Sequence, residues 1–292
     1  MGKKASVIIP TYQSWSDLQL CLDLLGQQTT PVSEYEIVVV NNAADEDAPA
    51  DLRVPPNCRI VTEPKPGSYA ARNAGIAEAT TDLLFFTDAD CRPHRGYIEK
   101  GLRTFAERPD ILRFAGAVEL EAAGPEWTIP EIYDMMTCLR QDRYASQGRA
   151  ATANVFVRRS AFEKVGLFDD EALSGGDMEW SRRAQAMGVE LVYDPEVIVG
   201  HPARLTFEEH ATKRRRILAA QIRNAGRKRT RYYLPPLKGF FPSFGILRRS
   251  LLDPDITTQQ ALKLWMFQYR LRRTVMMEQI KLMWFNGEPE RR

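Results

Sequence analysis

Two carboxylates with one residue between them end the apolar run LLFFTDAD, which covers residues 83–90. In an extended chain Asp88 and Asp90 leave the same side of the backbone, and Ala89 points the other way. Like charges held this close repel each other unless water solvates them or a cation lies between them. The pattern therefore indicates either a solvated turn or the carboxylate ligands of a divalent metal ion, and these residues alone leave both interpretations open.

The elements that carry such residues follow two alternating patterns. Short, nearly continuous apolar runs predict buried strands, and stretches with apolar residues at helical spacing predict amphipathic helices. The expected strands cover residues 6–10, 35–42, 58–64 and 83–90, and the expected helices cover 15–28 and 67–79. This order is typical of an α/β fold with a central, mostly parallel sheet that helices cover on both faces.

Polar clusters fall where three of these strands end. They are Thr11-Tyr12, Asn41-Asn42 and Asp88-Ala89-Asp90. Because ligands bind outside the carboxyl ends of the strands in open α/β sheets, we expect the three clusters to form one binding site.

The pattern loosens after about residue 110. A strand is expected over 114–122, a helical stretch of mixed polarity over 125–149, and a strand that runs into a short helix over 150–170. SGGDMEWSRRAQAMG predicts a loop that enters a helix, and VELVYDPEVIVGHP predicts two short strands around Pro195.

Five segments together resemble the family-2 glycosyltransferases with the GT-A fold. They are VIIPTYQSWSDLQLCLDLL, IVVVNNAADE, KPGSYAARNAGIAEA, LLFFTDAD and GGDMEWSRRAQAMG, in the family's order and with VIVGHP after them. The resemblance covers roughly residues 6–202. It implies metal-dependent, inverting transfer of a sugar from a nucleotide-diphosphate sugar to an acceptor hydroxyl, in the synthesis of a cell-surface polysaccharide or glycolipid.

The resemblance also implies a metal site for Mn²⁺ or Mg²⁺. In the family's pattern Asp90 is the closer ligand, while Asp88 leans toward the ribose and the metal-bound waters. Such a cation neutralises the leaving diphosphate and needs only one or two carboxylates from the protein. His201 at the end of VIVGH matches a histidine that completes the metal site in several GT-A enzymes, and the alternative is a structural histidine.

The donor nucleotide is expected to lie against Thr11, Tyr12, Asn41 and Asn42. Family members often have an aspartate in the second loop, and NNAADED lacks it at that point, so a UDP-sugar is the default donor and dTDP- or GDP-sugars stay open. The alternative role of the asparagines is that of turn residues. Arg72 is expected to contact the base or the diphosphate, and it could instead be a salt-bridge partner.

Asp177 matches the family's catalytic base, which takes the proton of the acceptor hydroxyl. The acid that usually precedes it is replaced by Gly176, and Asp177 could also cap the helix that follows. Glu179, Trp180 and Asn154 are expected near the acceptor or the donor sugar, although a tryptophan in a helix can equally belong to the core.

Charge divides the chain in two. Residues 1–202 carry 20 Lys and Arg against 31 Asp and Glu, a net charge of −11, whereas residues 203–292 carry 20 against 7, a net charge of +13. We therefore expect a GT-A domain over 1–202 and a basic, amphipathic helical region over 203–292. Its aromatic and basic stretches favour contact with an anionic membrane surface, which would suit a lipid-linked saccharide acceptor. The alternative is that these helices pack on the catalytic domain or form an oligomer interface, and the oligomeric state stays open.

Other features narrow the setting. The four cysteines form no CxxC pair and no disulfide framework is expected. The sequence shows neither a signal peptide nor an apolar run long enough to span a membrane, and no nucleic-acid-reading motif accompanies the basic clusters. A cytoplasmic enzyme, peripheral on the inner face of the membrane, is expected. The alternative function is a catalytically silent nucleotide- or carbohydrate-binding scaffold, and a nearer rival makes polyprenyl-phosphate sugars.

Overall fold

The computed structural model describes the chain except for residues 1, 44, 173, 226–230, 235–238 and 286–292. The chain forms two compact units, of which the first comprises Met1–Glu119 and Leu139–Pro202 and the second comprises Leu120–Cys138 and Ala203–Arg292. Leu120–Cys138 therefore pack with the C-terminal helices and not with the residues that flank them in the sequence.

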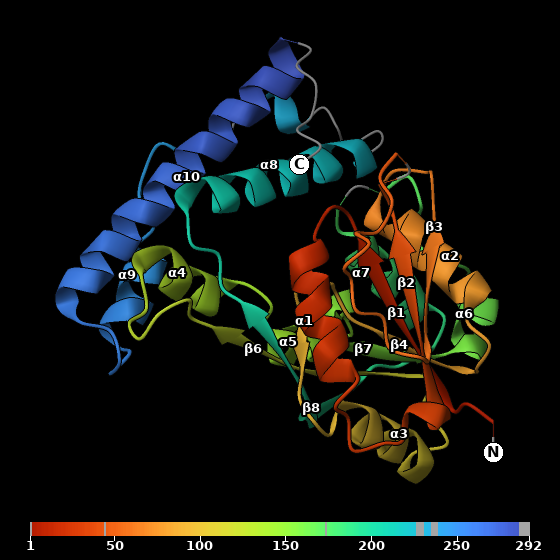
Figure 1. The fold of residues 1–292 in the computed structure, drawn as a ribbon. Coiled ribbons are helices and arrows are strands. Elements are labelled where there is room, and N and C mark those ends of the chain that lie inside the picture. The colour runs from red at the N-terminus through yellow and green to blue at the C-terminus, as the bar shows by residue number, and fades with distance from the viewer. Residues whose placement is uncertain (1, 44, 173, 226–230, 235–238, 286–292) are drawn as a thin grey trace. The chain divides into compact units, whose positions relative to one another are not determined.

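One sheet organises the first unit. Its strands are β1 (Ala5–Thr11), β2 (Tyr35–Asn41), β3 (Cys58–Thr62), β4 (Leu83–Phe86), β5 (Arg92–Pro93), β6 (Arg113–Glu121), β7 (Val155–Arg158) and β8 (Val192–Pro202). They lie in the order β3-β2-β1-β4-β7-β6-β8-β5. β1 to β4 are parallel, while β7 is antiparallel to β4 and β6, and β5 is antiparallel to β8. The predicted α/β fold with a mostly parallel central sheet is confirmed (Figure 1).

Helices cover both faces of this sheet. The helical segments of the chain are α1 (Trp15–Leu25), η1 (Val32–Glu34), α2 (Ser68–Glu78), α3 (Tyr97–Glu107), α4 (Ile129–Thr137), α5 (Gln141–Ala145), η2 (Thr152–Asn154), α6 (Arg159–Val165), α7 (Gly176–Ala186), α8 (Phe207–Asn224), α9 (Phe244–Leu251) and α10 (Thr258–Trp284). Side chains alternate along β1, so Val7 and Ile9 pack with α1 and α3, whereas Ile8 packs with α2, α6 and α7.

Helix α2 lies very close to β1. A Cβ atom at Gly75 would overlap the side chain of Ile8, so only glycine permits this approach. The start of α2 is tied to the end of β2, because the Gly67 N–H donates to Oδ1 of Asn42 over 2.7 Å. The first turn of α2 therefore lies at the carboxyl ends of the strands.

Two expectations from the sequence differ from the structure. β8 is one strand that continues through Pro195, because Pro195 is exposed and the short β5 pairs only with Val199 and Gly200. A proline is tolerated at such an unpaired edge since its missing N–H has no ladder partner to lose. The stretch 125–149 contains two helices, α4 and α5, which are separated at Leu139, where φ is +48°.

The second unit is helical. Helix α10 packs along α8, α9 and α4, and its apolar side chains form a core with Tyr133, Ile246 and their neighbours. Asp134, which has no exposed side-chain area, accepts hydrogen bonds from the guanidinium of Arg204 over 3.0 Å. None of the described helices has an apolar stretch long enough to cross a membrane.

Candidate active site

The register of the parallel strands brings the predicted polar clusters to one edge of the sheet. Thr11 pairs with Asn41, and Ile8 pairs with Phe86 at the end of β4. The loop that carries the aspartates leaves β4 at Thr87, whose hydroxyl donates to the Ala153 carbonyl over 3.0 Å. The ends of β1, β2 and β4 thus lie next to one another, as the alternation of strands and helices predicted.

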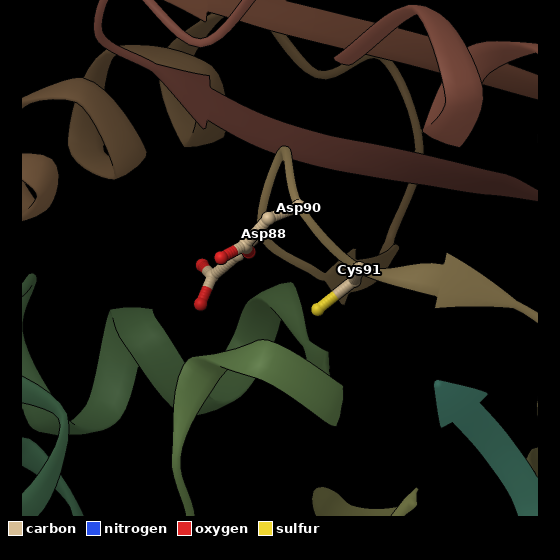
Figure 2. Close-up of side chains that lie close together, drawn as sticks. All are labelled: Asp88, Asp90 and Cys91. Carbon is tan, nitrogen blue, oxygen red and sulfur yellow. The ribbon is translucent and has the colours of Figure 1, made fainter. Parts of the chain in front are cut away.

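Asp88 and Asp90 come together with Cys91 (Figure 2). One ligand atom from each lies within 4.8 Å of the others, and the two carboxylates point to the same side of the loop. Cys91 is buried, burial raises its pKa well above the usual value, and its sulfur lies 3.7 Å from the Ala153 carbonyl that it can donate to. A neutral thiol is a poor ligand for a hard cation, so the carboxylates are the better metal ligands of the three.

His201 faces this loop from β8. Its Nε2 lies 3.5 Å from Oδ2 of Asp90, and its Nδ1 lies 2.8 Å from the Pro202 carbonyl oxygen. Because a carbonyl only accepts, Nδ1 donates to it, and in the neutral form of the ring Nε2 has its lone pair on the side of Asp90. This is the arrangement of a metal-binding histidine, whose second nitrogen is fixed by a carbonyl.

The local electrostatics also fit a cation. Burial raises the pKa of Asp90; the neighbouring Asp88 raises it further, and His201 opposes the shift. Two carboxylates and one imidazole nitrogen form a donor set for Mn²⁺ or Mg²⁺. The residues therefore fit the metal that the sequence resemblance implies.

Arg72 forms an ion pair with the loop that carries the two aspartates. It is buried in α2, its Nη2 pairs with Oδ1 of Asp88, and its Nη1 donates to the Ser68 carbonyl over 3.2 Å. In this structure Arg72 is a salt-bridge partner of Asp88, which is the alternative role that the sequence left open. Its Nε is buried and has no hydrogen-bond partner among the described residues.

The two asparagines at the end of β2 hold loops in place. Asn42 donates to the carbonyls of Glu63 and Lys65 over 2.8 and 2.7 Å and accepts from Gly67. Asn41 donates to the Glu46 carbonyl over 2.6 Å and accepts from Ala43. In this structure both asparagines thus make the loop contacts of turn residues, and the contact of Asn41 and Asn42 with the nucleobase stays a prediction.

Two residues at the end of β1, Thr11 and Tyr12, have groups that a ligand could contact. Thr11 is buried, and its hydroxyl has no hydrogen-bond partner among the described residues. Tyr12 exposes 47% of its surface beside it. A buried hydroxyl without a partner is costly, so a ligand that reached Thr11 would satisfy it.

Asp177 lies in the first turn of α7. The helix begins at Gly176 with Gly175 as its N-cap, so Asp177 stands two residues after the N-cap position and the predicted capping role is wrong. Its Oδ1 accepts from the Met178 N–H over 2.8 Å and from the hydroxyl of Tyr69 over 3.0 Å. Neither contact uses Oδ2.

Several influences act on the Asp177 carboxyl group. Burial raises its pKa, the hydrogen bonds from Met178 and Tyr69 and the charge of Arg72 lower it, and the charge of Asp88 raises it. Burial has the larger effect, so the pKa lies above the usual value for an aspartate. Asp177, Tyr69, Arg72 and Asp88 thus form one connected group, whose hydrogen bond and ion pair join the predicted base to the predicted metal site.

Two of the three residues predicted near the acceptor or the donor sugar, Trp180 and Asn154, are buried. Trp180 donates to the Gly166 carbonyl and packs on Phe162 and Phe168, so it is a core residue. Asn154 has no exposed surface and donates to the Ala117 and Val197 carbonyls over 2.7 and 2.9 Å, which ties neighbouring strands together. The structure thus gives both residues packing contacts, and their contact with a sugar stays a prediction.

Glu179 and Asp177 lie on different sides of α7. Two residues on an α-helix are about 200° apart around its axis, and Glu179 accepts from Arg183 over 2.8 Å. Arg183 also donates to the Val165 and Leu167 carbonyls, so it anchors Glu179 to the loop after α6. The other carboxylate oxygen of Glu179, Oε2, is buried without a hydrogen-bond partner among the described residues, and the contact of Glu179 with the acceptor stays a prediction.

Two residues of the site were absent from the sequence analysis. Cys91 follows the aspartates directly and could have been found by its position. Tyr69 stands in the quoted GSYAARN segment, but its partner Asp177 is far away in the sequence, and no local pattern indicates that contact.

Comparison with known proteins identifies the family. The profile named Glycosyl transferase family 2 matches residues 6–166. The chain is 36% identical over 229 residues to the glycosyltransferase AglE of Haloferax volcanii, covering 74% of this chain and 72% of that protein. It is 26% identical over 215 residues to the pre-mycofactocin glycosyltransferase of Mycobacterium tuberculosis, covering 71% of this chain and 44% of that protein.

A more distant relative has a named lipid-linked substrate. Over 219 residues the chain is 21% identical to the dolichyl N-acetyl-alpha-D-glucosaminyl phosphate 3-beta-D-2,3-diacetamido-2,3-dideoxy-beta-D-glucuronosyltransferase of Methanococcus voltae, covering 70% of this chain and 68% of that protein.

Solved structures share the fold at low sequence identity. The mannosyltransferase PcManGT of Pyrobaculum calidifontis, in complex with GDP-Man and Mn²⁺, aligns with a TM-score of 0.64 and 17% identity over 98% of this chain and 89% of that chain. Residues 1–349 of S. aureus TarS, in complex with UDP-GlcNAc, align with a TM-score of 0.53 and 14% identity over 96% of this chain and 91% of that chain. The chain belongs to glycosyltransferase family 2 and is a nucleotide-sugar-dependent glycosyltransferase with the GT-A fold.

Proposed function

We propose that the first unit catalyses direct displacement at the anomeric carbon of a nucleotide-diphosphate sugar, with Asp177 as the general base. The observation that supports this most is the connected group in which Asp177 is joined through Tyr69 and Arg72 to Asp88 of the predicted metal site. It brings a carboxylate that can accept a proton to the same edge of the sheet as the carboxylates that can hold a cation.

The reaction balances with these groups. The acceptor O–H bond breaks and its proton moves to Asp177, while the acceptor oxygen forms a bond to the anomeric carbon. The bond between the anomeric carbon and the diphosphate oxygen breaks, and its electron pair leaves with the diphosphate. Attack opposite the leaving group inverts the configuration at the anomeric carbon.

Asp88, Asp90 and Nε2 of His201 would hold the metal ion. When bound, a divalent cation neutralises the charge that develops on the leaving diphosphate. Support comes from the donor set, the tautomer of His201 and the Asp90 pKa raised by burial. PcManGT was solved with Mn²⁺, and imidazole suits Mn²⁺ better than Mg²⁺, so we propose Mn²⁺ as the preferred ion.

The donor nucleotide is proposed to lie at the ends of β1 and β2. Thr11 contributes a buried hydroxyl without a described partner, and Tyr12 contributes an exposed ring. Arg72 carries a positive charge at the base of the loop that holds Asp88. The neighbouring structures contain GDP-Man and UDP-GlcNAc, so both bases are candidates, and a UDP-sugar remains our first choice.

The acceptor is proposed to be a lipid-linked saccharide at a membrane surface, in the synthesis of a cell-surface polysaccharide or glycolipid. The name of the M. voltae relative specifies a dolichyl N-acetyl-alpha-D-glucosaminyl phosphate as its acceptor. In the second unit, residues 240–252, which we name the aromatic segment, expose large apolar side chains: Phe240, Phe241, Phe244, Leu251 and Leu252. The exposed Arg248 and Arg249 lie within it, in a region with a net charge of +13. Apolar side chains flanked by arginines fit an anionic bilayer.

Ligand binding and nucleotide release test the proposal. Thermal unfolding is measured with GDP-mannose, UDP-N-acetylglucosamine, UDP-glucose and dTDP-glucose, each with Mn²⁺ or with EDTA. One donor should raise the midpoint only with Mn²⁺, by an amount that corresponds to about 3 kcal/mol at a hundredfold excess over Kd. Slow release of the free nucleotide from that donor should follow. Donor binding without any release, with water or with saccharide acceptors, would favour the alternative of a catalytically silent scaffold.

A matched variant separates binding from chemistry. Asp177→Asn keeps the size of the side chain and removes the base, so the variant should bind the donor with Mn²⁺ as the wild type does and release nucleotide at least a hundredfold more slowly. A loss of donor binding would show that Asp177 holds the donor and would overturn its role as the base.

A further inference from the structure

Tyr69 occupies the space that a side chain at residue 176 would need. A Cβ atom built on Gly176 would lie 2.8 Å from two ring carbons of Tyr69, which is closer than real Cβ atoms approach. The ring is 5% exposed and packs on Phe168 at a centroid distance of 5.8 Å. The glycine that departs from the family's acidic pair is therefore matched by a tyrosine from another helix.

The ring of Tyr69 also lies between two charged groups. Its hydroxyl donates to Oδ1 of Asp177 over 3.0 Å, and the guanidinium carbon of Arg72 lies 5.4 Å from the ring centroid. Arg72 is paired with Asp88 in turn. Burial raises the pKa of the Tyr69 phenol, so the hydroxyl is protonated at neutral pH and is a hydrogen-bond donor there.

The carboxylate of Asp177 is held through one oxygen. Oδ1 accepts from Tyr69 and from the Met178 N–H, and these two bonds fix the plane of the group. The other oxygen, Oδ2, uses neither bond and remains available to a proton.

We propose that Tyr69 is a positioning residue for the catalytic base: its hydroxyl fixes Oδ1 of Asp177 so that Oδ2 receives the acceptor proton, and Gly176 is required because the Tyr69 ring fills its side-chain space. This inference rests on the proposed role of Asp177 as the base. In this chain the family's acidic residue before the base is replaced by Gly176. The ring of Tyr69 fills the space of that missing side chain and contacts the base instead.

A pH profile distinguishes this role from a purely structural one. A hydrogen bond to the ionised form of a carboxyl group lowers its pKa, so Tyr69→Phe should raise the pKa of Asp177. The charged groups that also face Asp177, Arg72 and Asp88, remain unchanged in this variant. The acid limb of kcat/KM for donor hydrolysis should move up by about one pH unit, and kcat on the plateau should fall about tenfold to a hundredfold because the base is less well oriented.

The matched control is Tyr35→Phe. Tyr35 is a buried tyrosine of the same unit whose hydroxyl donates to the Leu25 carbonyl over 2.5 Å, on the face of the sheet that α1 covers. Its loss should lower the melting temperature without moving the acid limb. Gly176→Ala is a second test, because it keeps the hydroxyl and displaces the ring, and it should move the acid limb in the same direction as Tyr69→Phe.

The hydrolysis assay uses water as the acceptor. Its donor is the nucleotide sugar that raises the midpoint of thermal unfolding in the presence of Mn²⁺. A second measurement needs no donor: in a double-mutant cycle with Asp177→Asn, the melting temperature should show that Tyr69→Phe costs less stability once Asp177 is changed. If Tyr69→Phe keeps the wild-type acid limb and shows no coupling to Asp177, the inference is overturned. If Asp177→Asn hydrolyses the donor normally, the assignment of Asp177 as the base is wrong. This result differs from the one that overturns the role of Tyr69 alone.

Discussion

The Nε2 atom of His201 lies 3.5 Å from Oδ2 of Asp90, although the two residues are far apart in the sequence. The contact exists because β8 pairs with β5, where Gly200 is opposite Arg92 just after the loop of Asp90. The hydrogen bond between Nδ1 and the Pro202 carbonyl leaves the lone pair of Nε2 on the side of that carboxylate. The pair therefore places one carboxylate oxygen and one imidazole nitrogen side by side, as the proposed metal site requires.

Asp90→Asn tests the oxygen ligand. The amide has nearly the size of the carboxylate but no charge, so Mn²⁺ affinity in the presence of UDP should fall at least about tenfold, and metal-dependent nucleotide release should be lost. Calorimetric titration with Mn²⁺ and UDP measures the change. Asp110→Asn is the control, because Asp110 is exposed and pairs only with Arg108 on the surface; equal losses in both variants would contradict the assignment.

His201→Gln tests the nitrogen ligand. Removing the imidazole should weaken Mn²⁺ more than Mg²⁺, because Mg²⁺ prefers oxygen ligands. The ratio of activities with the two ions should therefore shift toward Mg²⁺ by about tenfold. His94→Gln, which changes an exposed histidine near the same loop, should leave the ratio unchanged. An unaltered ratio in His201→Gln would assign the residue a structural role.

The activity of the wild-type enzyme should depend on pH through Asp177. Burial raises the pKa of this carboxyl group, with Asp88 adding to the shift and Met178, Arg72 and Tyr69 opposing it. A base must be ionised to accept a proton, so activity is present above this pKa and falls tenfold for each pH unit below it. The acid limb of kcat/KM should lie above the value of about 3.9 for an exposed aspartate. A profile that stays flat down to pH 4 would exclude Asp177 as the base.

Local patterns were enough to predict the sheet and the position of the acidic loop at its edge. The strand that precedes Asp88 is a continuous apolar run, and the acids directly follow it, so secondary structure and position at the sheet edge could be derived from neighbouring residues alone. The parallel register then brings the ends of β1, β2 and β4 together, whatever the loops between them contain. Fold class is predictable to this extent because it depends on hydrophobic periodicity.

The roles of single side chains were less predictable. Trp180 and Asn154 stand in the right segments, but their burial depends on neighbours such as Phe162 and Val197 that pack from other elements. The pairing of Tyr69 with Asp177 arises in the same way. A sequence pattern places a residue on an element, whereas the face it presents and its partners follow from tertiary packing, which no linear motif contains.

Glu36 should make the stability of the first unit depend on acid pH. Its side chain has no exposed area; burial opposes its ionisation, but hydrogen bonds from Ser6, Thr80 and Arg59 outweigh this and lower its pKa from 4.5 to about 2. Because the pKa is lower in the folded state, the stabilisation is present above pH 4.5 and is lost as the pH falls from 4.5 toward 2.

The size of this effect follows from the shift. A pKa change of this size corresponds to about 3 kcal/mol, so Glu36→Gln should lower the free energy of unfolding at pH 7 by about 2–4 kcal/mol. Urea unfolding at pH 7 and pH 3 measures both effects, and the difference between wild type and variant should shrink at pH 3. Glu34→Gln, which removes a partly exposed pair with Lys4, should cost less than about 1 kcal/mol.

The aromatic segment should determine binding to anionic membranes. Phe241 and Phe244 expose 68% and 70% of their surfaces in the second unit, and Arg248 and Arg249 are exposed nearby. Burying a phenylalanine side chain in the interfacial region is worth about 1.5–3 kcal/mol, so Phe241→Ser with Phe244→Ser should lower the partition coefficient for phosphatidylglycerol vesicles about a hundredfold. Co-sedimentation measures this, and added salt should weaken the wild-type binding because the arginine contribution is screened.

Leu167→Ser, at an exposed apolar position of the first unit, is the matched control and should bind as the wild type does. Equal binding of all three proteins, or equal binding to phosphatidylcholine vesicles, would contradict a membrane-facing role for this segment.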